Sequence, residues 1–209
     1  ELNTGEITFQ RFRIIACAIG GFEEDDIFTD VGCGIGNVAF QAALQFRVGA
    51  SFGIDINAKA IELMKTTIAA HVQAFPMLKN VIPVTDDVRT PRWRTAMYIQ
   101  SSTILYSNNV RFDKEANLMM ETFVIHSNSL QALAVFRPFC GRHRKKCQRP
   151  FCQLWTLASV VKVPVHWPAK VGPAYTYKRC EYSNRRRRFR IIAFGIAFVH
   201  RPSIIPKAP

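Results

Sequence analysis

Short apolar runs alternate with amphipathic stretches along the first part of the chain. Residues 26–32, 50–56 and 80–84 are apolar and partly β-branched, a profile typical of buried parallel strands. Between them, residues 37–46 and 58–75 have the composition and apolar spacing of helices, and Pro76 would end the second one. Because strands that alternate with helices form parallel sheets with right-handed crossovers, this order predicts an α/β fold.

The same alternation continues, less regularly, through the middle of the chain. Residues 102–110 and 129–136 are predicted to form a fourth and a fifth strand, with a helix over residues 113–127 between them. A short helix is expected near residues 91–99. These elements extend the predicted parallel sheet.

The C-terminal third departs from this order. A basic, Cys-containing loop is expected over residues 137–152, and residues 154–163 and 174–182 are predicted to pair as antiparallel strands. The predicted fold class is therefore α/β, with a mostly parallel seven-stranded sheet that carries helices on both faces. We place the folded domain, which we expect to be truncated at its N-terminus, at residues 1–182 and a basic C-terminal tail at residues 183–209.

Positive charge is concentrated toward the end of the chain. The 28 Lys and Arg residues outnumber the 15 Asp and Glu residues, which gives a formal net charge of +13. The clusters RHRKK (142–146) and NRRRRFR (184–190) favour nucleic acid, chromatin or an anionic membrane surface as a neighbour. No apolar stretch approaches the roughly 18 residues of a membrane span, and no secretory signal is visible. We therefore expect a soluble intracellular protein, without a membrane partner, whose six cysteines are reduced.

A glycine-rich turn follows the first predicted strand. The stretch DVGCGIGN (30–37) places three glycines between a strand and a helix, where a missing Cβ lets a ligand approach the backbone. Its spacing differs from the G-x-G-x-x-G of dinucleotide-binding folds, and Asp30 would repel a pyrophosphate. An acid at this position suits S-adenosylmethionine, which carries a sulfonium and an ammonium group. A tight turn without a ligand is the alternative interpretation.

Two further acidic residues follow the next two strands. Asp55 ends the second predicted strand, where a carboxylate can accept hydrogen bonds from both hydroxyls of a ribose. Asp87 follows the third strand and fits an acceptor for the adenine amino group. Either residue could instead be a solvated loop acid. The interpretation of both as cofactor-binding residues therefore depends mainly on their positions in the loops after successive strands.

An ordered set of motifs resembles one family of methyltransferases. YSNNVRF (106–112), after the fourth strand, is similar to the VNNF-like motif of the disruptor of telomeric silencing (DOT) family of histone H3 lysine methyltransferases. Similar segments occur in the family's order at GEITF (5–9), DVGCGIGNVAFQAA (30–43), FGIDI (52–56), DDVRTPRW (86–93), FRPF (136–139) and VHWPAKVGPAYTY (165–177). The resemblance implies a class I, Rossmann-like methyltransferase fold. It also implies a nuclear chromatin regulator that uses S-adenosyl-L-methionine to methylate a lysine in the globular core of nucleosomal histone H3.

The same resemblance implies roles for individual residues. By position, the cofactor site would contain Thr4, Gly5, Glu6, Ile7, Asp30, Gly32, Cys33, Gly34, Gly36, Asn37, Asp55, Asp87, Val88 and Phe112. The catalytic set, which lines the channel for the acceptor lysine, would be Asn108, Trp167, Tyr175 and Tyr177. Separately from the resemblance, the charge of the basic tail predicts that Arg185, Arg186, Arg187 and Arg188 contact the DNA of a nucleosome.

An aromatic channel suits a lysine acceptor on chemical grounds. A free lysine has a pKa of about 10.4, whereas methyl transfer requires the neutral amine. Aromatic walls remove water from the ammonium group and lower its pKa, so that the proton can leave to solvent without a dedicated base. Proximity and alignment would then supply much of the acceleration, and Asn108 fits as a neutral polar anchor.

Two other functions stay open at this stage. A nucleic-acid amino-methyltransferase would suit the net charge, but NNVR (108–111) lacks the prolines of the NPPY loop that many such enzymes have. A catalytically inactive chromatin-binding module would keep the fold and the tail. Thr4, Val88 and Val110, which stand where the family usually or often has aromatic residues, keep that alternative open. The sequence does not indicate an oligomeric state.

The basic loop contains residue types that can bind zinc. Its candidate ligands are Cys140, His143, Cys147 and Cys152. Their spacing matches no common zinc site, so we expect incidental thiols in a solvated loop and no metal.

Overall fold

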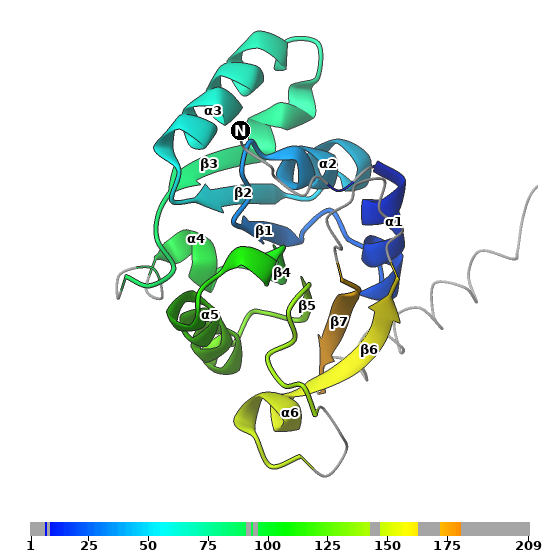
Figure 1. The fold of residues 1–209 in the computed structure, drawn as a ribbon. Coiled ribbons are helices and arrows are strands. Elements are labelled where there is room, and N and C mark those ends of the chain that lie inside the picture. Colours follow the sequence, from blue (N-terminus) through cyan, green and yellow to red (C-terminus); the bar gives the residue numbers. More distant parts are fainter. Residues whose placement is uncertain are drawn as a thin grey trace, which may run out of the picture.

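A single seven-stranded sheet forms the centre of the computed structural model, which describes residues 7, 9–90, 93, 96–142, 147–162 and 172–180 (Figure 1). The strand order is β3-β2-β1-β4-β5-β7-β6. The strands are β1 (Ile27–Val31), β2 (Ala50–Asp55), β3 (Val81–Thr85), β4 (Ile104–Ser107), β5 (Ala132–Val135), β6 (Trp155–Val161) and β7 (Ala174–Arg179). Strands β1 to β5 pair in parallel, and β7 lies antiparallel between β5 and β6. The predicted mostly parallel sheet with an antiparallel closing pair is confirmed.

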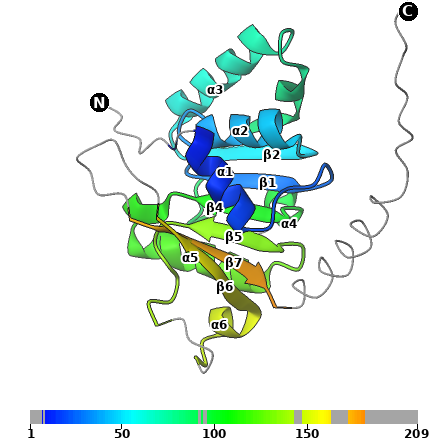
Figure 2. The same cartoon turned by 90° about the vertical axis from the view of Figure 1, so that its right-hand side faces the viewer.

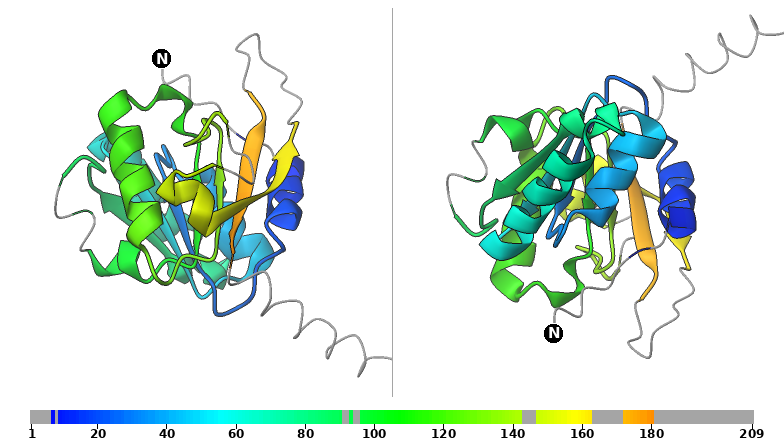
Figure 3. Two further views of the ribbon diagram at one scale, coloured as in Figure 1. Left: turned by 90° about the horizontal axis from the view of Figure 1, so that it is seen from below. Right: turned by 90° about the horizontal axis from the view of Figure 1, so that it is seen from above.

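Helices cover both faces of this sheet. They are α1 (Phe9–Ala18), α2 (Asn37–Phe46), α3 (Ala58–His71), α4 (Met97–Gln100), α5 (Lys114–His126) and α6 (Pro150–Leu154), with 3-10 turns η1 (Pro76–Asn80) and η3 (Asn109–Arg111). In Figure 3 the strands separate α1 from α5. Figures 1 and 2 place α3 and α6 at opposite ends of the molecule. Within the described residues, no helix is both long and apolar enough to cross a membrane.

The order of the strands reverses between β1 and β4. The chain builds β1, β2 and β3 outward in one direction, then returns to add β4 and β5 on the other side of β1. In open parallel sheets, ligands bind beside the carboxyl ends of the strands at such a switch point. The fold therefore places the glycine turn after β1 and the loop after β4 at the position where a ligand is expected.

Helix α1 is the main element that the sequence pattern did not predict. Its buried side chains Phe12, Ile15 and Ala16, followed by Ile19, recur at helical spacing. Phe12 is the centre of an aromatic cluster, with ring centroids 5.7–5.9 Å from those of Phe22, Phe28, Phe46 and Tyr106. The helix thus completes the core on the α2 side of the sheet.

Several element boundaries differ from the prediction. Helix α3 ends at His71, and η1 follows from Pro76, because proline is tolerated at the start of a helical turn but not inside one. The helix expected near residues 91–99 is observed as α4, and residues 91–92 and 94–95 lie outside the described residues. Helix α6, with Pro150 in its first turn, occupies the end of the segment that was expected to be a loop.

Candidate active site

The glycine turn after β1 has a backbone that only glycine adopts easily. Gly32, Gly34 and Gly36 have φ angles of 79°, 57° and 90°, in the left-handed region. The N–H groups of Gly32 and Cys33 donate to the carbonyl of Ile54 at 2.8 and 3.0 Å, which ties the turn to the end of β2. Gly36 then caps α2 without a side-chain hydrogen bond, and Asn37 begins the helix.

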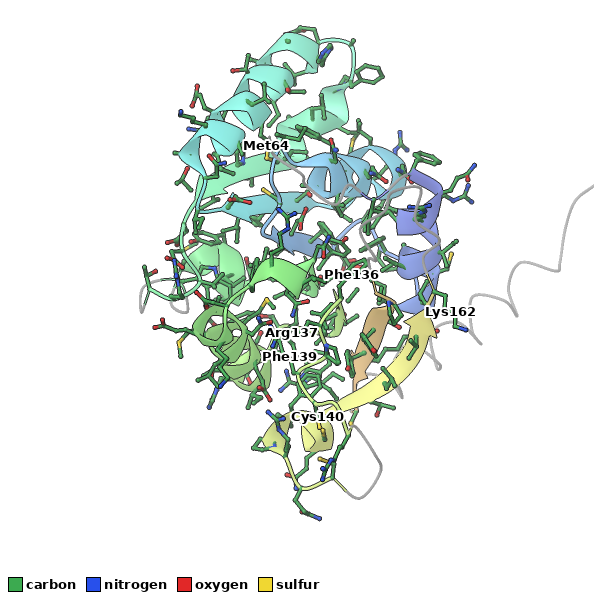
Figure 4. The ribbon with its side chains drawn as sticks, viewed as in Figure 1. Met64, Phe136, Arg137, Phe139, Cys140 and Lys162 are labelled. Atoms are coloured by element: carbon green, nitrogen blue, oxygen red, sulfur yellow. The ribbon has the colours of Figure 1, made fainter. Side chains whose placement is uncertain are left out.

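Two side chains fill the space that a Cβ would need in this turn. A Cβ on Gly32 would lie 2.8 Å from Cε1 and Cζ of Phe112, so the ring of Phe112 packs directly against the turn. A Cβ on Gly36 would lie 2.6 Å from Sδ of Met64, and one on Gly53 would lie 2.6 Å from its Cε. Figure 4 labels Met64 on α3. The fold therefore brings together Gly32 and Phe112, two residues predicted for the cofactor site.

Asp30 is a buried carboxylate at the carboxyl end of β1. It is only 2% exposed and lies in register with Tyr106 of β4. Burial, and next the charge of Asp55, raise the pKa of Asp30 well above its usual range. The charged form is therefore costly without a cationic neighbour, and an ammonium or sulfonium group would relieve that cost. This matches the charge of S-adenosylmethionine.

Asp55 is fixed on the glycine turn by two backbone hydrogen bonds. Its Oδ2 accepts from the N–H of Gly34 at 2.9 Å, and its Oδ1 accepts from the N–H of Asn57 at 2.8 Å. Each carboxylate oxygen has further acceptor capacity, so the predicted pairing with ribose hydroxyls is compatible with this geometry. Asn57 in turn caps α3 through the N–H groups of Lys59 and Ala60.

Asp87 is held by an arginine that the sequence reasoning did not single out. Nε and Nη2 of Arg89 donate to its carboxylate at 3.0 and 2.7 Å, and Nη1 reaches Asp113 at 3.1 Å. Hydrogen bonds from Arg89 are the main reason that the pKa of Asp87 is lowered. Asp87 is thus a fixed anion beside Val88, which is buried in the core. The preceding Asp86 is buried and accepts a hydrogen bond from the hydroxyl of Tyr98.

The two asparagines after β4 occupy different environments. Asn108 is half-buried and directly follows the strand, whereas the side chain of Asn109 is fully buried. Oδ1 of Asn109 accepts from the N–H groups of Phe136 and Arg137 at 3.0 and 2.8 Å. Its Nδ2 donates to the carbonyl of Arg137 at 2.9 Å and to Oδ1 of Asn117 at 2.8 Å. Asn109 therefore ties the loop that carries Asn108 to the exit of β5 and to α5.

The two tyrosines predicted for the acceptor channel lie on the same side of β7, because side chains two residues apart in a strand share a face. Tyr175 is half-buried. Tyr177 is fully buried, with its ring centroid 5.0 Å from that of Phe151 and an interplanar angle of 77°. Burial is also the main cause that raises the pKa of Tyr177. This environment favours a packing role for Tyr177, while its channel role stays a prediction.

Several predicted site residues lie outside the described residues. They are Thr4, Gly5, Glu6, Trp167, Arg185, Arg186, Arg187 and Arg188, together with the candidate zinc ligand His143. Ile7 is described and buried, and its carbonyl accepts from Nε2 of Gln41 on α2 at 3.4 Å. Cys33 is half-buried in the turn, where its thiol donates to the carbonyl of Gly34 at 3.5 Å.

Sequence reasoning missed Asn109, Asp86 and Arg89. Two asparagines in succession directly after a strand were a usable signal for Asn109. A polar side chain that is buried at this position needs hydrogen-bond partners for its polar atoms. Nothing in the sequence marks Asp86 over Asp87, because both follow β3 and only the fold decides which one points inward.

The strand order, the glycine turn at its switch point and the acids beside that turn together define a class I, S-adenosylmethionine-dependent methyltransferase. Solved structures share this fold at low sequence identity. An rRNA methylase from Streptococcus thermophilus is 10% identical with a TM-score of 0.53, over 81% of this chain and 94% of that one. The candidate methyltransferase SMU.1697c from Streptococcus mutans, in complex with SAH, is 12% identical with a TM-score of 0.57, over 83% and 99%. TrmK from M. capricolum, in complex with S-adenosyl-homocysteine, is 8% identical with a TM-score of 0.54, over 83% and 68%.

The chain belongs to the DOT1 family, described as histone methylation protein DOT1, whose model matches residues 4–164. No curated protein gives a significant match. Family and fold together indicate S-adenosylmethionine as the cofactor. The buried Asp30, the left-handed backbone of the glycine turn and the oriented Asp55 fit that cofactor.

Proposed function

We propose that this chain transfers the methyl group of S-adenosylmethionine to a lysine in the globular core of histone H3, on nucleosomes in the nucleus. The observation that carries the proposal is the position of Asn108. This neutral, half-buried amide directly follows β4, at the same edge of the sheet as the glycine turn, in a loop that Asn109 holds to β5. The description of the family, which names histone methylation, supports a histone as the acceptor.

The residues of the chain would bind and orient the two reactants. The cofactor supplies an electrophilic methyl group on a sulfonium. Asp30 would compensate positive charge of the cofactor, and Asp55, fixed by Gly34 and Asn57, would hold the ribose. Phe112 packs on the turn from the loop after β4, so the same short segment that carries Asn108 also contacts the predicted cofactor site. This connection would align acceptor and donor.

A neutral amide suits the acceptor side of the site. The lysine must lose a proton before its nitrogen can attack, and a carboxylate beside it would stabilise the ammonium form. Asn108 can accept or donate a hydrogen bond without carrying charge. Its expected role is to orient the amine while the proton leaves to water, and half-buried Tyr175 is a candidate for the adjoining aromatic wall.

The nucleosome is proposed as the physiological substrate because of charge. The excess of positive charge includes the cluster NRRRRFR (184–190), which suits contacts with DNA phosphates. Arg185 to Arg188 are the proposed contact residues. A lysine on the folded part of a histone is surrounded by nucleosomal DNA. An enzyme that binds this DNA would therefore be held beside the lysine.

The decisive experiment measures transfer of a labelled methyl group to nucleosomes, free histones and RNA in parallel. We expect labelled histone H3 from nucleosomes, and a large loss of label with Asn108→Ala. Gly141→Ala serves as a control, because a Cβ at that position meets no atom within 4 Å. Label in RNA alone would instead establish the nucleic-acid methyltransferase, and bound cofactor without transfer to any substrate would establish an inactive module.

A further inference from the structure

Three cysteines that are separated in the sequence converge beside α6. Cys140 lies beyond the end of β5, Cys147 precedes α6, and Cys152 is within α6. Their Sγ atoms all lie within 4.8 Å of one another, and those of Cys140 and Cys147 are 3.9 Å apart. The expectation of incidental thiols in a loop did not anticipate this convergence, because the turn that precedes α6 is not evident from the spacing.

The separation of the Cys140 and Cys147 sulfur atoms is that of two ligands around one metal ion. In a tetrahedral site with Zn–S bonds of about 2.3 Å, neighbouring sulfurs are about 3.8 Å apart. A disulfide would require a sulfur separation of about 2.05 Å. The 3.9 Å between Cys140 and Cys147 therefore matches two ligands of a shared ion and excludes a disulfide between them in this structure.

The three thiols are held in place by the surrounding packing. Phe139, next to Cys140, packs edge to face on Phe151 of α6, with ring centroids 5.2 Å apart. Phe151 is fully buried, and Arg149, directly before α6, is paired with Glu121 of α5 at 2.8 Å, so α6 is held both by the core and by α5. Figure 4 shows Phe136, Arg137, Phe139 and Cys140 following one another from the sheet toward α6. A site held in this way loses little conformational freedom when it binds an ion.

We propose that Cys140, Cys147 and Cys152 form a structural zinc site. Soft thiolate ligands select zinc over magnesium or calcium, and three thiolates leave one tetrahedral position for a further donor such as water. Binding releases the thiol protons to solvent and forms Zn–S bonds, with no change of oxidation state. Cys140 is buried, whereas Cys147 and Cys152 are half-buried, so the site is partly accessible to solvent.

The proposed ion would connect α6 to the segment that anchors the loop after β4. Cys140 lies three residues after Arg137, whose backbone is bonded to the side chain of Asn109. Zinc would therefore stabilise the antiparallel edge of the sheet and, through this segment, the position of the loop that bears Asn108. This role concerns stability and does not depend on which acceptor the enzyme methylates.

The test is a metal titration of the purified full chain under reducing conditions. We expect one equivalent of zinc per chain, a higher Tm with zinc than with chelator, and a sulfur-to-metal charge-transfer band when Co²⁺ replaces zinc. Cys147→Ser and Cys152→Ser should each lower zinc affinity at least about tenfold and abolish the rise in Tm. Cys17→Ser, which changes an exposed thiol on α1, should alter neither.

Retention of zinc by the triple variant of Cys140, Cys147 and Cys152 would overturn the proposal, as would wild-type protein with free thiols that binds no zinc. A disulfide among the three in protein purified under reducing conditions would overturn it as well. If a single variant folds poorly, the Co²⁺ spectrum of the wild-type protein still decides, because a band without thiolate character contradicts the assignment.

Discussion

The carboxylate of Asp55 accepts a hydrogen bond from the backbone N–H of Gly34 at 2.9 Å, which connects the end of β2 to the middle of the turn after β1. The same carboxylate bonds to Asn57 at the start of α3. Asp55, which is predicted to bind the ribose, is therefore already oriented by the turn that would contact the rest of the cofactor. Orientation before binding reduces the entropy that the protein loses when the cofactor binds.

Replacing Gly32 by alanine should weaken cofactor binding and folding together. The backbone at φ 79° disfavours an L-residue by about 1–2 kcal/mol, and the new Cβ would push the ring of Phe112 off the turn. Calorimetry should show at least about a tenfold loss of S-adenosylmethionine affinity. Gly141→Ala is the matched control, and equal affinity for both variants would contradict the placement of the cofactor.

Asp30→Asn should stabilise the free protein and weaken cofactor binding. The unfolded chain releases the Asp30 proton near pH 4, whereas burial holds the pKa of the folded protein well above its usual range, so Asp30 costs stability as pH rises above about 4. The amide removes this cost, and we expect a higher Tm at neutral pH and a flatter dependence of Tm on pH.

In the presence of cofactor the effect should reverse, because the amide loses the attraction to positive charge. We expect affinity to fall about tenfold. Thermal melts with and without S-adenosylmethionine between pH 4 and 8 measure both effects, and Asp25→Asn, an exposed acid, is the control. A lower Tm of the ligand-free variant at neutral pH would be inconsistent with this explanation.

The two asparagines after β4 should respond differently to alanine. Asn108→Ala should reduce turnover strongly and leave cofactor affinity within a few-fold, because the amide proposed to orient the acceptor is lost while Asp30 and Asp55 are kept. Asn109→Ala leaves the N–H groups of Phe136 and Arg137 without their acceptor, and should destabilise the fold by about 2–4 kcal/mol. Urea denaturation and initial rates separate the two effects. Equal destabilisation by both variants would remove the proposed distinction.

The aromatic cluster under α1 should contribute strongly to stability. Phe12→Ala is expected to cost about 3–5 kcal/mol, since the ring is 1% exposed and has four aromatic neighbours. Phe9→Ala, on the same helix but 53% exposed, should change stability by no more than about 0.5 kcal/mol. Chemical denaturation of both variants checks this, and similar losses would mean that α1 does not pack through Phe12.

The basic tail should determine how nucleosome binding depends on salt. Converting Arg185, Arg186, Arg187 and Arg188 to Gln removes four charges, so the slope of log affinity against log salt should fall by up to about 3.6. Cofactor affinity should be unchanged, and Lys65→Gln on α3 is the control. An unaltered slope would direct attention to the other basic cluster, RHRKK at residues 142–146.

The sequence allowed the sheet and the glycine turn to be predicted because both depend on local signals. Apolar runs mark β1 to β5, and Asp30 and Asp55 stand visibly at or next to the carboxyl ends of β1 and β2. Helix α1 was missed because its buried stripe spans only eight positions, 12–19, and directly follows a stretch that the resemblance assigns to the cofactor site. The partners of Asn109 lie 27 and 28 residues away, and the thiols converge only through α6, so neither arrangement can be derived from spacing.

Met64 on α3 occupies the volume that two missing side chains would need, one at Gly36 and one at Gly53. A side chain added at either glycine would have to displace the same thioether, so the three positions share one space. A side chain added at Gly53 requires the flexible end of Met64 to move, whereas one added at Gly36 is strained in any case by the φ angle of 90°. The glycine turn and β2 therefore depend for their packing on one side chain of α3 that belongs to neither of them.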